Sequence, residues 1–241
     1  YKKERKHRNK DMSFYVLKKA IDFFIQKVDN NKKEGSCIGF YGGEPLLKFN
    51  LIKKAIEYIS NEHIRFTLTT NGSLLNREII NYFIKNNVSI VISLDGPEKI
   101  HDRYRVYPDG SGTFRQIFKN ILLINEIDEN YFKNEVLFNI VIAPPYNFGE
   151  IIDFFYRNKE IDIVPSKLNF TPVDSYQTSF FKDMGLDDQK YMKLEIINTF
   201  FNKYKHSLVN QKHDQLNIEK KLFDKDFHII RSREMRFLGK K

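Results

Sequence analysis

Cysteine is nearly absent from this sequence. The 241 residues include one cysteine, Cys37, so no internal disulfide can form and a reducing cytoplasm is the expected location. No apolar run reaches the ~18 residues that a membrane-spanning helix needs, so no membrane partner is expected. The basic start, "YKKERKHRNK", is not followed by the apolar stretch typical of a signal peptide.

Two glycine patterns that mark phosphate and dinucleotide sites, Gly-x-x-x-x-Gly-Lys and Gly-x-Gly-x-x-Gly, are also missing. The net charge of +9 would allow an acidic or nucleic-acid partner. The lysines, however, are spread along predicted helix faces, and only residues 2–10 form a dense basic block. Nucleic-acid binding is therefore the weakest of the functional alternatives.

The sequence does contain a regular alternation of apolar patterns. A helical period predicts helices at 12–30, 50–59 (with Asn50 as the cap), from 76, from 113 and around 148–159. Alternating or continuous apolar runs predict strands at 37–41, 64–72, 88–97, 135–145 and 167–174. After about residue 187 only helical periodicity is visible.

This alternation predicts an α/β protein with a parallel sheet and right-handed crossovers. We expect a partial (β/α) barrel of the TIM-like kind over residues 12–180. A basic segment precedes it at residues 1–11, and a helical segment follows it at residues 181–241. In such a barrel, ligands bind at the carboxyl ends of the strands.

Polar and glycine-rich residues follow the predicted strands at that rim. Gly42, Gly43 and Glu44 come after the first strand, Asn71 after the second, and Ser93 ends the third. Each of these alone could be turn chemistry, or, for Glu44, an acid favoured at a helix N-terminus. Together they predict one site spanning the rim.

The residue types at this rim suit a zwitterion. Two adjacent glycines expose backbone groups at close range. Glu44 suits an amine, while Arg105 can grip a carboxylate with two parallel hydrogen bonds. An amine beside a carboxylate is the head group of an amino acid.

Five short motifs carry a family resemblance: "FYGGEPLL", "TLTTNGSLL", "ISLDGP", "HDRYR" and "GSGTF". In this order and spacing they resemble the radical S-adenosylmethionine (radical SAM) enzymes. The likeness is greatest to the peptide- and protein-maturing branch, which has a C-terminal cysteine-rich (SPASM-type) extension, and it covers about residues 12–174. It implies that S-adenosylmethionine contacts the residues matching the family's positions, namely Gly42, Gly43, Glu44, Asn71, Ser93 and Arg105. Val173 is a candidate for packing on the adenine.

The resemblance also implies groups that this chain does not supply. The family holds a four-iron, four-sulfur ([4Fe-4S]) cluster with a Cys-x-x-x-Cys-x-x-Cys loop after its first barrel strand, and here neither that strand nor the triplet is found. We therefore expect the central barrel of a longer protein, lacking the first strand. In the intact relative, an electron donor and the cluster would generate a 5′-deoxyadenosyl radical that modifies a peptide or protein substrate.

Two other interpretations stay open: a non-catalytic module that binds S-adenosylmethionine or a peptide, and the nucleic-acid-binding protein. No residue is assigned as catalytic, and no metal ligand is expected in this chain. Cys37 is predicted to be a buried core residue. His101, Asp102 and Arg103 are predicted to be surface ion-pairing residues outside the site.

Overall fold

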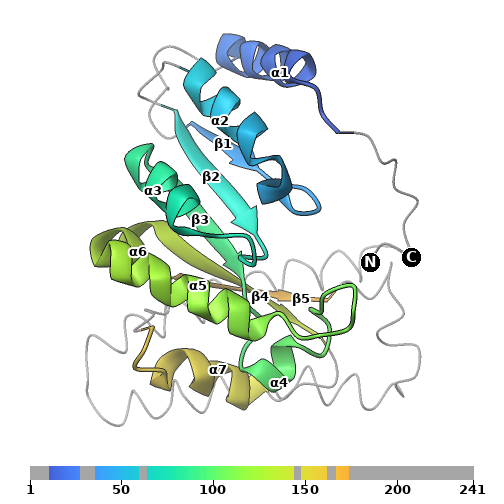
Figure 1. The fold of residues 1–241 in the computed structure, drawn as a ribbon, viewed down its shortest axis with the longest axis vertical. Coiled ribbons are helices and arrows are strands. Elements are labelled where there is room, and N and C mark those ends of the chain that lie inside the picture. Colours follow the sequence, from blue (N-terminus) through green and yellow to red (C-terminus); the bar gives the residue numbers. More distant parts are fainter. Residues whose placement is uncertain (1–10, 28–35, 60–63, 144–147, 162–166, 174–241) are drawn as a thin grey trace, which may run out of the picture. The chain divides into compact units, whose positions relative to one another are not determined.

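The structure is a computed structural model that describes residues 11–27, 36–59, 64–143, 148–161 and 167–173. The predicted helical segment at 181–241 and nearly all of the predicted basic segment at 1–11 lie outside these residues. The alternation of strands and helices is confirmed within them (Figure 1).

Five strands form a sheet in the order β1-β2-β3-β4-β5, as expected for the predicted α/β fold. Their bounds are β1 (Cys37–Phe40), β2 (Arg65–Thr70), β3 (Val88–Ser93), β4 (Val136–Ile142) and β5 (Leu168–Pro172). The helices are α1 (Phe14–Lys27), a 3₁₀ turn η1 (Pro45–Lys48), α2 (Phe49–Tyr58), α3 (Arg77–Lys85), α4 (Glu98–His101), α5 (Phe114–Ile127), α6 (Glu129–Glu135) and α7 (Phe148–Arg157). The chain divides into two compact units, one of residues 1–94 with 113–137 and the other of residues 95–112 with 138–241.

In the first unit, β1, β2 and β3 run parallel, and helices α2 and α3 overlie them in the view of Figure 1. The register pairs Thr70 with Ile92, so Asn71 and Ser93 are the next residues along neighbouring strands. Side chains of β2 alternate between exposed and buried, while β3 is buried along most of its length. The core residues with no exposed surface here include Leu68, Ile80, Phe83, Val88, Ile90 and Ile92.

Local sequence explains the helix that follows β2. The helix begins where it was predicted, and the Asn76 side chain caps it by accepting a hydrogen bond from the N–H of Ile79 at 3.0 Å. Ile79, Ile80 and Phe83 then bury one face of the helix. The turn between β2 and α3 requires a glycine at position 72, where φ is +79°.

In the second unit, β4 pairs in parallel with β5, and α7 buries its apolar face. The rings of Phe148 in α7 and Phe170 in β5 meet edge to face with their centroids 5.5 Å apart. Gly96 begins the turn into α4 with φ of +136°, and a Cβ at that position would lie 3.3 Å from the Ile151 side chain. The chain therefore turns sharply at Gly96, between β3 and α4.

Three expectations are wrong. Cys37 is exposed rather than buried, because β1 lies at the edge of the sheet. Asn50 does not cap α2, which begins at Phe49 after the η1 turn. His101 is not a surface residue, since it has no exposed area at all. The short helix α6 was not predicted.

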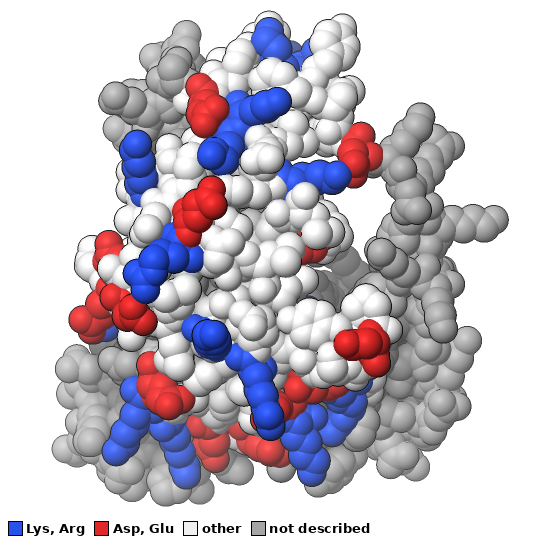
Figure 2. Space-filling model, viewed as in Figure 1, with Lys and Arg blue, Asp and Glu red and all other residues white. Residues whose placement is uncertain are grey.

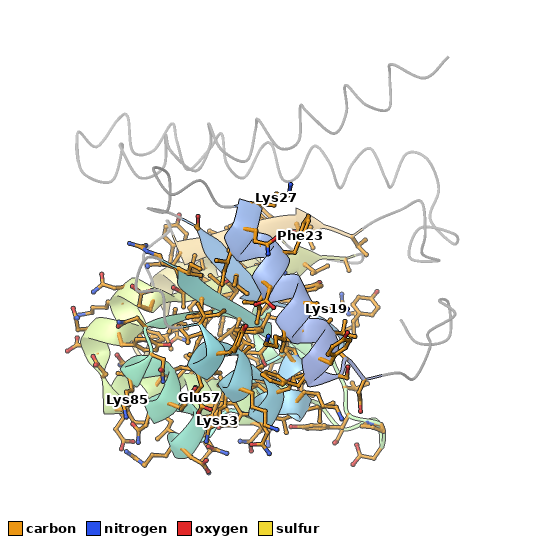
Figure 3. The ribbon with its side chains drawn as sticks, turned by 90° about the horizontal axis from the view of Figure 1, so that it is seen from above. Lys19, Phe23, Lys27, Lys53, Glu57 and Lys85 are labelled. Atoms are coloured by element: carbon orange, nitrogen blue, oxygen red, sulfur yellow. The ribbon has the colours of Figure 1, made fainter. Side chains whose placement is uncertain are left out.

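The surface shows no concentration of one charge on the face drawn in Figure 2, where basic and acidic side chains are interspersed. On α1, Lys19, Phe23 and Lys27 follow one another along an outer side of the helix (Figure 3), and the Lys27 ammonium lies 5.7 Å from the Phe23 ring centre. Among the described residues, no helix is both long enough and apolar enough to cross a bilayer.

Candidate functional site

The Glu44 carboxylate joins the loop after β1 to the end of β2. One oxygen, Oε1, accepts hydrogen bonds from the Thr70 hydroxyl at 2.7 Å and from the N–H of Leu46 at 3.0 Å. The other, Oε2, accepts from the N–H of Asn71 at 2.8 Å. Charge-assisted bonds of this kind are stronger than neutral ones, so Glu44 fixes the Gly42–Gly43 segment relative to β2.

The Glu44 contacts also resolve its alternatives. Glu44 is the N-cap of η1, so the interpretation as an acid at the start of a helix is confirmed. The contacts to Thr70 and Asn71 come from a strand 26 residues further along the chain, and a capping role alone does not require them. The carboxylate thus lies at the carboxyl end of β2, where the site was predicted.

Gly42 and Gly43 border open space. A Cβ built on either residue meets no atom within 4 Å, so neither glycine is required by its own packing. Neither has a positive φ. The bare backbone beside Glu44 is therefore accessible to a ligand, in the place where the resemblance puts the amino group of S-adenosylmethionine.

The turn that carries Asn71 is held from two sides. The Asn71 side-chain oxygen accepts hydrogen bonds from the N–H and the hydroxyl of Ser73, at 2.8 and 2.7 Å. The buried Asn120 of α5 donates to the carbonyl of Gly72 at 2.8 Å. Asn120 was missed from the sequence, because nothing in its spacing within a helix distinguishes it from a surface polar residue.

Ser93 ends β3, one strand away from Asn71. The residue is 8% exposed, and its hydroxyl has no hydrogen-bond partner among the residues that the structure describes. A buried hydroxyl without a partner is uncommon in native proteins and calls for a ligand or water to satisfy it. The structure therefore brings Glu44, Asn71 and Ser93 to neighbouring strand ends, with Ser93 able to serve a ligand.

Arg105 belongs to the second unit and has a partner that the sequence did not predict. Its Nε and Nη2 donate to the two oxygens of Asp95 at 2.6 and 3.0 Å, a two-pronged ion pair. The predicted two-pronged grip on a ligand carboxylate is therefore not available through this edge of the guanidinium while Asp95 holds it. Because each unit is described by itself, the predicted grouping of Arg105 with Glu44 stays a prediction.

His101 contacts the backbone of Asp95, the partner of Arg105 in this ion pair. Its Nδ1 accepts a hydrogen bond from the backbone N–H of Asp95 at 3.2 Å, so the ring proton belongs on Nε2. Burial lowers the pKa of His101 from its ordinary value of 6.5 to about 4, and the ring is neutral at pH 7. Val173, the candidate for the adenine, is buried, and its N–H donates to the carbonyl of Ile142 at 2.9 Å.

Comparison with known proteins decides the family. The sequence pattern of the Radical SAM superfamily matches residues 9–155, which is more than half of the chain. The chain belongs to the radical SAM superfamily. The resemblance found in the five motifs is thereby confirmed.

Several relatives with assigned activities are named as enzymes that mature another protein, a sulfatase. The radical SAM cyclopropyl synthase TigE of Paramaledivibacter caminithermalis is 31% identical over 79% of this chain and 37% of its own length. A cysteine-type anaerobic sulfatase-maturating enzyme of Clostridium novyi is 28% identical over 60% of this chain and 39% of its own. A serine-type enzyme of Bacteroides thetaiotaomicron is 30% identical over 72% and 40%. The chain thus spans about two fifths of the length of these relatives.

Solved structures confirm the fold. A structure described as native anSMEcpe with bound AdoMet superposes with a TM-score of 0.65 at 22% identity, covering 85% of this chain and 54% of that one. The same protein with AdoMet and the Kp18Cys peptide gives 0.62 at 21% identity over 83% and 53%. The radical SAM partial barrel is therefore the architecture of this chain.

The residues present differ in how well they fit the family's two groups. Open backbone at Gly42 and Gly43, the Glu44 carboxylate and the unsatisfied Ser93 hydroxyl fit the amino-acid part of S-adenosylmethionine. They do not fit a four-iron cluster, which needs three thiolates where this chain has one cysteine. In the described residues, moreover, no group of three or more potential ligands is placed to hold a metal ion.

Proposed function

We propose that this chain is the S-adenosylmethionine-binding core of a radical SAM enzyme that modifies a peptide or protein. Family membership supports the cofactor, and the names of the sulfatase-maturating relatives support the class of substrate. One observation carries the binding role. The buried Ser93 hydroxyl lacks a partner among the described residues, one strand away from Asn71 and two strands away from the open glycine backbone that Glu44 fixes in place.

In this proposal the ligand's ammonium group binds near Glu44 and the carbonyls of Gly42 and Gly43. The Ser93 hydroxyl and the Asn71 turn contact the same ligand from the ends of β3 and β2. Arg105 contacts the carboxylate of the ligand, as the sequence resemblance implies. S-adenosylmethionine would itself be the precursor of the radical, and forming the radical needs the cluster, which the one cysteine of this chain does not hold by itself.

The proposal is tested by binding of S-adenosylmethionine to this chain, measured by calorimetry or equilibrium dialysis. We expect saturable binding by the parent. Gly43→Val should weaken it at least tenfold while leaving the unfolding free energy nearly unchanged, since a side chain there fills space that no protein atom occupies.

Ser93→Ala gives a second, independent result. Removing a buried hydroxyl that has no partner should leave stability unchanged or raise it by about 1 kcal/mol, while ligand affinity falls several-fold. Ser89→Ala is the matched control, because Ser89 lies near the opposite end of β3 and its hydroxyl already donates to Glu135. Absence of saturable binding by the parent, or parental affinity in both Gly43→Val and Ser93→Ala, would overturn the proposal.

A non-catalytic module that binds S-adenosylmethionine is the second candidate. It predicts the same S-adenosylmethionine binding. Flanking coding sequence separates the two candidates: a Cys-x-x-x-Cys-x-x-Cys motif within about 25 residues upstream of Tyr1 would favour the enzyme.

A further inference from the structure

We propose that Asp95 is a positioning residue that orients Arg105 toward the carboxylate of the bound ligand. The inference rests on the proposed function and assigns a role to a residue that the motifs mark only as part of a turn. The two side chains form a two-pronged ion pair, with Nε to Oδ2 at 2.6 Å and Nη2 to Oδ1 at 3.0 Å. This geometry fixes both the place and the plane of the guanidinium.

Asp95 is itself rigidly held. Its Oδ1 also accepts a hydrogen bond from the N–H of Val141 in β4 at 2.9 Å, and its own N–H donates to Nδ1 of His101. Its side chain is 9% exposed. The Asp95 carboxylate is bonded both to a strand and to an arginine, and the Asp95 backbone is bonded to His101. The carboxylate therefore has a single orientation, which it passes on to Arg105.

His101 holds the backbone of Asp95 and leaves its carboxylate to Arg105. The histidine is fully buried and accepts a hydrogen bond at Nδ1, so it contributes no positive charge beside Asp95.

Stability alone does not account for the pair. Replacing a buried ion pair with apolar residues is often neutral or stabilising, because desolvation offsets the attraction between the charges. The two partners also differ in exposure: the Arg105 side chain keeps 26% of its surface exposed, against 9% for Asp95. A rotamer-rich arginine that is already immobilised loses less conformational entropy when a ligand binds. The pair therefore has the features of a preorganised contact: Asp95 is buried and holds Arg105 in place, and the Arg105 side chain is partly exposed.

The test compares two ligands that differ by one group, S-adenosylmethionine and its decarboxylated analogue, on the chain as it stands. Asp95→Asn keeps an oxygen that can accept from Val141 but removes the charge that holds Arg105. We expect it to bind S-adenosylmethionine about tenfold more weakly, the loss of one charge-assisted contact, and to bind the decarboxylated analogue like the parent.

A double-mutant cycle shows whether Asp95 acts through Arg105. Arg105→Ala alone should lose affinity for S-adenosylmethionine to a similar or larger extent, and adding Asp95→Asn to it should cost nothing further. The exposed Arg103, on the same turn, supplies the matched control: Arg103→Ala should bind both ligands normally. Asp95→Glu keeps the charge but displaces it by one methylene, so it should show the same loss restricted to S-adenosylmethionine even if Asp95→Asn folds poorly.

The outcomes separate the possible roles. Equal losses for both ligands would mean that Asp95 only maintains the fold, and this would overturn the inference. Parental or tighter binding by Asp95→Asn would mean that Asp95 competes with the ligand for Arg105, and this would overturn it as well. In both cases the proposed function survives. A parent chain that binds neither compound would instead refute the proposed function, and the inference with it.

Discussion

The carboxylate of Glu44 accepts a hydrogen bond from the backbone N–H of Asn71 at 2.8 Å, which ties the loop after β1 to the turn after β2. The same carboxylate accepts a hydrogen bond from the Thr70 hydroxyl. It lies beside Gly42 and Gly43, which border open space. A residue proposed to bind the ligand's ammonium therefore also organises the site in the absence of ligand. This dual use has a measurable consequence for stability.

Glu44→Ala should lower the free energy of unfolding by about 2 kcal/mol, because the buried Thr70 hydroxyl and the N–H of Asn71 lose a charged acceptor. Glu44→Gln should lose less, since one side-chain oxygen remains to accept. Chemical denaturation at neutral pH measures both values.

Glu57 is the matched control for this prediction. It lies on the exposed side of α2 (Figure 3), and Glu57→Ala should change stability by no more than about 0.5 kcal/mol. Equal stabilities for the two alanine variants would show that the Glu44 contacts contribute nothing to the fold, leaving the ligand as its sole role.

The local features of the sequence were sufficient for much of the fold. The start of α3 at Asn76 was predicted because the signals of a helix start are local, and the capping bond itself spans only three residues. Asn50 was wrongly assigned as a cap for a reason that is also local. The 3₁₀ turn at Pro45–Lys48 leads directly into α2, which begins at Phe49. Asn50 therefore lies within the first turn of the helix and not at its cap position.

Features that depend on tertiary structure were not predictable from one sequence. His101 precedes two charged residues, Asp102 and Arg103, which suggested a surface position, yet it lies at the end of α4 and is fully buried. Cys37 begins an apolar strand, which suggested the core, yet its strand is an edge. Arg105 and Asp95 are ten residues apart with a glycine turn between them, so only the fold reveals their ion pair.

The buried His101 should make stability depend on pH. Its pKa is about 4 in the folded state, below the ordinary value of 6.5, because burial disfavours the charged ring. The unfolded chain therefore takes up the proton first as pH falls. The contribution to stability is complete above about pH 6.5 and is lost between there and about pH 4, for a total of about 3 kcal/mol.

The variant His101→Asn tests this dependence. Its side-chain oxygen can replace Nδ1 as the acceptor for the N–H of Asp95, while the titrating group is removed. The variant will be less stable than the parent at pH 7, so the slope of stability against pH, rather than its value, is the quantity to compare. We expect a shallower slope between pH 6.5 and 4.5. Parallel slopes would show that folding does not lower the pKa of His101, which would contradict the prediction.

The last prediction concerns the iron–sulfur cluster. Four-iron clusters in this family are held by three cysteine thiolates, and this chain has only Cys37, which lies exposed in an edge strand with its sulfur 3.7 Å from the Thr67 hydroxyl. Anaerobic reconstitution of this chain with iron and sulfide should therefore leave no stable cluster after gel filtration. Cys37→Ser is the matched control and should retain the same background iron as the parent, since one thiolate contributes little to holding a cluster. Stoichiometric iron and sulfide in the parent, with the broad visible absorption of a four-iron cluster that disappears in Cys37→Ser, would show that Cys37 recruits a cluster with non-cysteine ligands. In that case the assignment of this chain as a core without cluster ligands would have to be abandoned.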